Sequence, residues 1–238
     1  MVRIVLDSKC HQAIRHQGSE GEYYRGRPAK TGPGAWRGRR LTGFQDALAE
    51  RGYGFAISDL SAAMRPEEAI LVIAGRAQEA PFTGAEMERI AAFCNHGGSL
   101  LLMANHARLV APQNQIAELL ALPVRFHEIT VPQDKQRLIL DAGHAISKGC
   151  PSGLRIRTSC TMTLEDCPSA AVLARNEDPE IGVFAVAMES EDKGRGRTVA
   201  MPSAGHIASD DDTHADLWPA ASNATWTLNI IEWLAYRL

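Results

Sequence analysis

The first half of the chain alternates short apolar runs with longer segments whose apolar residues recur every three or four positions. The apolar runs lie at residues 2–7, 53–58, 69–74 and 99–103. The segments with helical spacing lie at residues 42–52, 84–96 and 113–121. Short apolar runs are typical of buried strands, and their alternation with helices predicts a parallel sheet covered on both faces. We therefore expect an α/β fold with a flavodoxin-like, doubly wound, mostly parallel sheet.

Local signals mark where two of these helices begin and end. Thr83 and Glu86 have the spacing of a capping box, in which each side chain binds the other residue's backbone N–H. Thr42 and Gln45 have the same spacing, and Gly52 supplies a stop. We therefore expect one helix to begin at each capping box.

The pattern of predicted elements changes after Pro123, where strand candidates follow one another without helices between them. These candidates lie at residues 124–131, 137–141, 154–163, 170–175, 182–188 and 197–202. Consecutive strands of this kind indicate antiparallel additions at the sheet edge. The last segment, 221–238, has tryptophans and isoleucines at helical spacing and should pack on the sheet. We expect a single domain over residues 1–238, with a division near residue 123 as the alternative.

Composition narrows the classes of function. The 238 residues are 45% hydrophobic and 22% charged, which is typical of a globular protein. The net charge of −3 makes a nucleic-acid partner unlikely. No stretch approaches the roughly 20 apolar residues that span a bilayer, and the start does not resemble a signal peptide. Five cysteines without a CxxC pair argue against a disulfide framework or zinc ribbon. We expect a cytoplasmic protein that does not engage a membrane.

Polar residues follow several predicted strands. They are Asp7, Cys10 and His11 after the first strand, Asn105 and His106 after the strand at 99–103, and Ser203 and His206 after the strand at 197–202. Because parallel strands end at one edge of the sheet, these groups should meet there. His and Asp side chains together can transfer protons or bind a divalent metal. His106, His206 and Asp7 are thus catalytic candidates, and Cys10, His11, Asn105 and Ser203 are substrate-binding candidates.

A simpler interpretation is that strand-end loops are polar in most proteins, so some histidines fall there by chance. The metal signal is weak, because His206 and His214 are too far apart for a zinc motif and no HExxH occurs. Whether any cofactor or metal is bound is left open. Cys10 has no motif that would lower the pKa of its thiol, so its role as a nucleophile has little support.

Residues 18–40 lack apolar periodicity and are rich in Gly, Pro and Arg. Arginine side chains can hold a carboxylate or phosphate with two parallel hydrogen bonds. Arg37, Arg39 and Arg40 are therefore further substrate-binding candidates, in a loop that would close over a small polar or anionic molecule. The same loop would serve equally well as a solvated or dimer-forming arm. We also expect the chain to form a homo-oligomer.

Five segments share a pattern with one known superfamily. They are Ile70–Ala74, Phe82–Glu86, Gly97–Leu102, Gly143–Ile146 and Gly194–Ala200. Together they resemble the class I glutamine amidotransferase-like superfamily, in particular its trehalose-utilisation-type and uncharacterised branches. Amidotransferases of this class place a Cys in the turn after the strand matching 99–103, where this chain has Ala104, Asn105 and His106. His206 lies roughly where their catalytic His would be. The resemblance therefore implies the fold without glutamine hydrolysis.

Two hypotheses about function follow. In the first, the chain is a hydrolase or lyase for a small polar or anionic substrate, with His106, His206 and Asp7 in the site. In the second, it is a catalytically silent ligand-binding or assembly domain that uses the same sheet edge.

Overall fold

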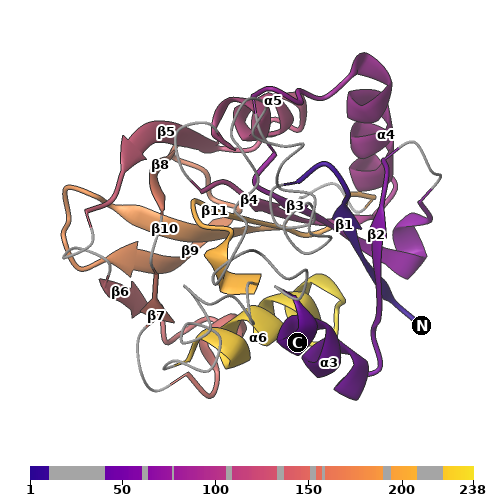
Figure 1. Cartoon of the computed structure of the whole chain (residues 1–238). Helices are drawn as coiled ribbons and strands as arrows, with labels where there is room; N and C mark the ends of the chain where they lie inside the picture. Colours follow the sequence, from indigo (N-terminus) through magenta and orange to yellow (C-terminus); the bar gives the residue numbers. More distant parts are fainter. Residues whose placement is uncertain are drawn as a thin grey trace, which may run out of the picture.

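The structure is a computed structural model, and it describes most of the chain outside a few loops. The described residues are 1–10, 41–60, 64–76, 78–105, 109–132, 137–150, 154–156, 159–189, 194–207 and 222–238, without the side chains of Glu68, Arg155 and His206. In this part an eleven-stranded sheet runs through the molecule, with helices above and below it (Figure 1).

The half of the sheet nearest the N-terminus is parallel. Its strands lie in the order β2 (Gly54–Ser58), β1 (Arg3–Asp7), β3 (Ala69–Ala74), β4 (Ser99–Met103) and β11 (Thr198–Met201). This is the strand order of flavodoxin-like folds. β3 and β4 are buried along their whole length, which explains why β3 is apolar throughout and β4 is apolar after Ser99. The four predicted parallel strands of the first half are confirmed.

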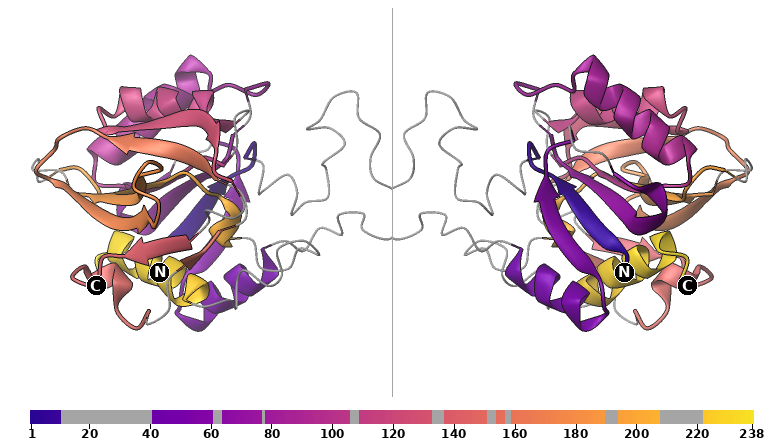
Figure 2. Two further views of the ribbon diagram at one scale, coloured as in Figure 1. Left: turned by 90° about the vertical axis from the view of Figure 1, so that its left-hand side faces the viewer. Right: turned by 90° about the vertical axis from the view of Figure 1, so that its right-hand side faces the viewer.

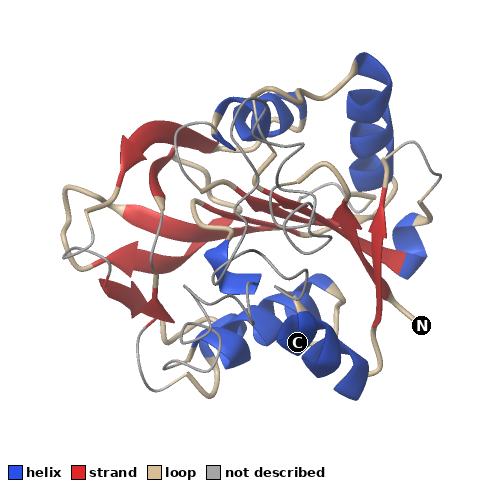
Figure 3. Ribbon diagram, in the orientation of Figure 1, coloured by secondary structure: helices blue, strands red, loops and turns tan. Residues whose placement is uncertain are grey.

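The second half of the chain continues the same sheet with antiparallel strands. β10 (Val183–Met188) pairs with β11, and beyond it lie β9 (Ala170–Asn176), β6 (Arg137–Leu140) and β7 (Leu154–Arg155). A branch is formed by β8 (Cys160–Leu164), which pairs with β10 and with β5 (Val124–Thr130). Figure 3 shows these strands, in red, fanning out from the parallel half. The predicted antiparallel additions are therefore confirmed, with two corrections. The candidate at 197–202 corresponds to β11, which lies parallel to β4. The candidate at 154–163 contains two strands, β7 and β8, with different partners.

Helices lie on both faces of the sheet, as a doubly wound fold requires. α4 (Gly84–Asn95) and α5 (Ala111–Leu119) cover one face, and α3 (Thr42–Glu50) and α6 (Asn223–Leu234) cover the other (Figure 1). The side views confirm the two layers (Figure 2). Three short 3-10 helices, η1 (Pro66–Glu68), η4 (Ala145–Ser147) and η5 (Gly205–Ile207), complete the described elements. None of the helices described is both long enough and apolar enough to cross a membrane.

The two predicted capping boxes have different outcomes. At α4 the Thr83 hydroxyl accepts from the Glu86 N–H, and the Glu86 carboxylate accepts from the Thr83 N–H, as predicted. At α3 the prediction was wrong, because Leu41 is the N-cap and Thr42 already lies inside the helix. Leu41 is fully buried, so its packing in the core sets where α3 begins. Gly52 ends this helix with a positive φ, as expected.

Candidate functional site

The carboxyl ends of β1 and β3 form the point where the strand order of this sheet reverses. In open α/β sheets, ligands bind in a crevice outside the strand ends at such a point. Here Asp7 is the last residue of β1, and Arg76 follows β3 after Gly75. The backbones of Cys10 and Arg76 pair in an isolated antiparallel bridge. Residues of the chain itself therefore occupy the point where the strand order reverses.

The Arg76 side chain occupies the centre of the position. Its guanidinium is 1% exposed and lies 3.2 Å from an Asp7 oxygen and 3.0 Å from a Glu86 oxygen. It also donates to the carbonyls of Ala80 and Pro81. The guanidinium carbon lies 4.1 Å from the centre of the Phe82 ring. Arg76 is therefore held on every side by protein groups.

Asp7 is fully buried and accepts hydrogen bonds at both carboxylate oxygens. Oδ1 accepts from the Lys9 N–H at 3.1 Å, and Oδ2 accepts from the Cys10 thiol at 3.3 Å and from Arg76. Burial raises the pKa of Asp7, and the Arg76 guanidinium offsets only part of that effect. Asp7 thus acts here as the acceptor at the centre of a hydrogen-bond network.

Cys10 is fully buried between β1 and β3. Its thiol donates to Asp7, and its sulfur accepts from the Ala74 N–H at 3.2 Å. Burial, together with the nearby Asp7 carboxylate, raises the pKa of the Cys10 thiol well above its usual value. Because only a thiolate is a good nucleophile, this environment favours a structural role for Cys10.

Glu86 connects the network to the N-terminus of α4. Its carboxylate accepts from the Thr83 N–H at 2.8 Å, from Arg76, and from Lys9 Nζ at 3.0 Å. Burial alone would raise the pKa of Glu86, but these hydrogen bonds and the Arg76 charge lower it to about 2. Asp7, Lys9, Cys10, Arg76 and Glu86 are named the switch-point cluster below. It contains two acids and two bases, so their formal charges cancel.

The remaining predicted residues lie farther along the same edge or outside the described residues. Asn105 and Ser203 are buried just after β4 and β11, whose ends are joined by a hydrogen bond from the Ala104 N–H to the Met201 carbonyl. The Asn105 side-chain oxygen is buried without a partner in the described part of the structure. His206 lies in η5, but its side chain is not described. Outside the described residues lie His11, Arg37, Arg39, Arg40, His106 and His214.

The structure thus brings Asp7 and Cys10 together, and it leaves the meeting of His106, His206 and His11 with Asp7 as a prediction. Within the described ranges, no three His, Cys, Asp or Glu side chains are grouped so that they could hold a metal ion.

Sequence reasoning placed Lys9 with Asp7 and Cys10 after the first strand, but it did not identify Arg76 or Glu86 as members of the cluster. Arg76 follows the apolar strand at 69–74 in the same way that Asn105 follows the strand at 99–103, so the strand-end rule applied equally to it. Glu86 was interpreted only as a helix cap, because nothing in its spacing showed that Arg76 would lie against it. The contact between the capping residue Glu86 and the strand-end residue Arg76 is therefore not apparent from sequence spacing.

Comparisons with known proteins identify the fold without a family. No protein-family model and no curated protein matches the sequence. Among solved structures, the mmIFT52 N-terminal domain superposes with a TM-score of 0.64 at 14% identity, covering 98% of this chain and 96% of that one. The cytoplasmic protein STM3548 from Salmonella typhimurium gives 0.64 at 13% identity, covering 98% of each chain.

A third similar structure is part of a longer enzyme. The exo-beta-1,4-mannosidase Op5Man5 from Opitutaceae bacterium strain TAV5 superposes with a TM-score of 0.53 at 15% identity. The match covers 98% of this chain and 36% of the mannosidase. At such low identities these likenesses establish the α/β fold and carry no activity with them.

Proposed function

We propose that this chain is a catalytically silent ligand-binding or assembly domain, rather than a hydrolase or lyase. The observation that supports the proposal is the position of Arg76, whose guanidinium fills the strand-reversal point and binds both Asp7 and Glu86. At the place where this fold usually opens a ligand site, the chain carries a neutral, internally satisfied cluster.

A general acid or base must come within hydrogen-bond distance of the proton that it transfers. The Asp7 carboxylate has no exposed surface, and its oxygens accept from Arg76, Cys10 and the Lys9 backbone. A substrate would have to displace Arg76, which would leave buried charges without partners at a cost of several kcal/mol. Asp7 is therefore better suited to stabilising the fold than to proton transfer.

The two positions at this edge where a cysteine nucleophile was considered support the same proposal. The turn after β4 has Ala104 and Asn105 where amidotransferases of the resembling superfamily have a Cys. Cys10 is the cysteine after β1, and its thiol donates to a carboxylate. The first position has no thiol, and the surroundings of Cys10 disfavour its thiolate. We therefore propose that the chain does not hydrolyse glutamine.

The proposal retains three expectations from the sequence. We propose that the chain belongs to a non-amidotransferase branch of the glutamine amidotransferase-like superfamily, that it works in the cytoplasm, and that it forms a homo-oligomer. The likeness to the cytoplasmic protein STM3548 supports the second of these. Light scattering coupled to size-exclusion chromatography would measure the oligomeric state directly.

The lack of catalysis at this edge can be tested with a substrate panel and three variants. Wild-type protein is incubated with chromogenic esters, amides, phosphoesters and glutamine. Asp7→Asn removes the buried carboxylate, and Asp46→Asn removes an exposed one on α3. We expect no turnover above buffer by any protein and a lower unfolding temperature for Asp7→Asn alone. Turnover that is lost in a folded Asp7→Asn protein, or in Cys10→Ser, and kept in Asp46→Asn would overturn the proposal.

A further inference from the structure

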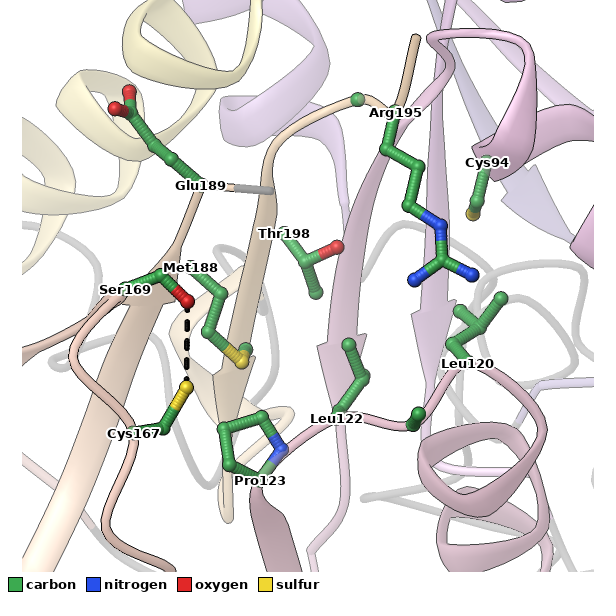
Figure 4. Close-up of a pocket in the computed structure, with 12 residues that line it drawn as sticks. Cys94, Leu120, Leu122, Pro123, Cys167, Ser169, Met188, Glu189, Arg195 and Thr198 are labelled. Carbon is green, nitrogen blue, oxygen red and sulfur yellow. Dashed lines mark hydrogen bonds between the residues drawn. The ribbon is translucent and has the colours of Figure 1, made fainter. Parts of the chain in front are cut away.

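A second feature lies at the opposite edge of the sheet, where β11 begins and β10 ends. A pocket of about 320 Å³ opens there (Figure 4). Its walls come from the end of α4, the segment between α5 and β5, the start of β9, and the residues that precede β11. A volume of this size is at the lower end of the range for small-molecule sites. It is called the Arg195 pocket below.

Arg195 supplies the cationic wall of this pocket. Its Nε donates to the Asn95 side-chain oxygen at 2.9 Å, which fixes the guanidinium plane against the end of α4. In Figure 4 the two terminal nitrogens of Arg195 point into the pocket. Among the described residues, these two nitrogens have no hydrogen-bond or ion-pair partner. No described residue therefore competes with an anion for these two nitrogens.

The backbone that carries Arg195 is held in place by close packing. The Gly196 N–H donates to the Cys94 carbonyl at 3.2 Å, and Leu100 N–H donates to the Arg197 carbonyl at 2.9 Å. Gly196 lies so close to Gly98 that a side chain on it would collide with the Gly98 carbonyl. The Arg195 side chain is exposed, but the packed backbone and the Nε hydrogen bond reduce the conformational freedom that it loses when it binds.

The pocket has no competing free anion among its described lining residues. Glu189 is its one acidic residue, and its carboxylate is turned away from the centre in Figure 4. It lies 2.7 Å from Arg197 Nε, and the Arg197 guanidinium in turn packs against the rings of Trp233 and Tyr236. Among the described lining residues, none thus neutralises the positive charge of Arg195.

The rest of the wall is mixed in character. Leu122, Pro123 and Met188 present apolar atoms across from Arg195 (Figure 4). The Ser169 hydroxyl and the Cys167 thiol lie 3.3 Å apart on the adjoining side and supply polar hydrogens. A fixed cation on one side and an apolar wall on the other are the two features that an amphipathic anion requires.

We propose that the Arg195 pocket binds a small monocarboxylate with a short apolar chain. The carboxylate accepts two parallel hydrogen bonds from the terminal nitrogens of Arg195, a geometry that arginine is suited to. The apolar chain packs against Leu122 and Met188. This inference goes beyond the proposed function, because the pocket lies at the other edge of the sheet and shares no residue with the switch-point cluster.

The test uses hexanoate, its neutral analogue hexanamide, and inorganic phosphate as probes of the full chain by calorimetric titration. We expect hexanoate to bind, and hexanamide and phosphate to bind at least about tenfold more weakly, because each lacks one of the two complementary features. Arg195→Gln keeps a polar group beside Asn95 but removes the charge, and we expect at least about tenfold weaker binding of hexanoate. Arg175→Gln, at the far end of β9, removes an exposed arginine and should leave binding unchanged.

A second variant tests the position of the apolar chain. Ser169→Phe fills the pocket from its half-buried rim and should abolish hexanoate binding without loss of the fold, checked by circular dichroism. Equal binding of hexanoate and hexanamide would overturn the proposal. So would binding that persists in Arg195→Gln or Ser169→Phe, or a wild-type protein that binds none of the probes. None of these results bears on whether the carboxyl edge is catalytically silent.

Discussion

At the scale of single residues, the carboxyl edge of the sheet contains a buried arginine between two buried carboxylates. Breaking a buried ion pair by removing one partner is far more costly than its net contribution to stability, because the remaining charge stays buried. The Arg76 side chain contacts two carboxylates at once, so its loss would remove the cation beside Asp7 and one of the two cations beside Glu86.

Replacing Arg76 should therefore cause a large loss of stability. We expect Arg76→Met to lower the free energy of unfolding by about 3–5 kcal/mol, measured by urea denaturation. Adding Asp7→Asn to Arg76→Met should cost less than Asp7→Asn does alone, because the unpaired charge is then absent. Additive effects of the two substitutions, or an Arg76→Met protein as stable as Arg175→Met, would contradict this assignment.

The two carboxylates should also act on stability in opposite directions as the pH changes. The pKa of Glu86 is about 2 in the folded chain against an ordinary 4.5, so its contribution is present above pH 4.5 and is lost as the pH falls towards 2. The pKa of Asp7 is raised from 3.8, so its ionisation costs stability, and protonation at low pH recovers that cost.

Urea denaturation of three proteins across the acid range separates these effects. We expect Glu86→Gln to flatten the loss of stability between about pH 5 and pH 3, because the group responsible is absent. Asp7→Asn should make the same loss steeper, because the opposing contribution is removed. Parallel stability curves for wild type and both variants would show that neither carboxylate has a perturbed pKa.

At the scale of elements, two glycines allow the turn after α4 to pack against the segment that enters β11. A side chain on Gly98 would collide with the Phe93 ring, and one on Gly196 would collide with the Gly98 carbonyl. We expect Gly196→Ala to lower the free energy of unfolding by about 1–3 kcal/mol, as overpacking in a tight contact does. Gly84 lies at the start of α4, and a side chain there would meet no atom within 4 Å.

Gly84→Ala is accordingly the matched control for that substitution. It should be neutral or stabilise the chain by about 0.5 kcal/mol, because it restricts the unfolded state without creating a clash. Thermal unfolding of both variants makes the comparison. If both alanines had the same effect, close packing at Gly196 would not be its cause.

Elements of this chain could be predicted well wherever one physical signal dominates. β3 and β4 are continuous apolar runs because both their faces are covered, and the Thr83 capping box depends on residues three positions apart. The start of α3 was not predictable in this way, because it is set by burial of Leu41 against distant parts of the core. The residues of the candidate site likewise differ in whether the sequence could predict them. Asp7 and Cys10 were found from the end of one strand, whereas Arg76 and Glu86 meet them only through the tertiary fold.

At the scale of the whole molecule, the sheet has no break between the two halves of the sequence. β4 from the first half and β10 from the second both pair with β11, and the buried apolar side chains of the two halves form one cluster. We expect a single cooperative unfolding transition in scanning calorimetry, with equal calorimetric and van't Hoff enthalpies. Two separate transitions would instead favour a division of the chain near residue 123.

The late position of β11 in the sequence also affects how the protein folds during its synthesis. β4 is fully buried and apolar after Ser99, yet the strand that covers its second edge is the last one of the described sheet to be synthesised. Until Thr198 and the residues after it leave the ribosome, that edge has unpaired backbone groups and can pair with another nascent chain. Translation that stops before this strand would release an aggregation-prone fragment, so the last strand also protects the first half of the protein during its biosynthesis.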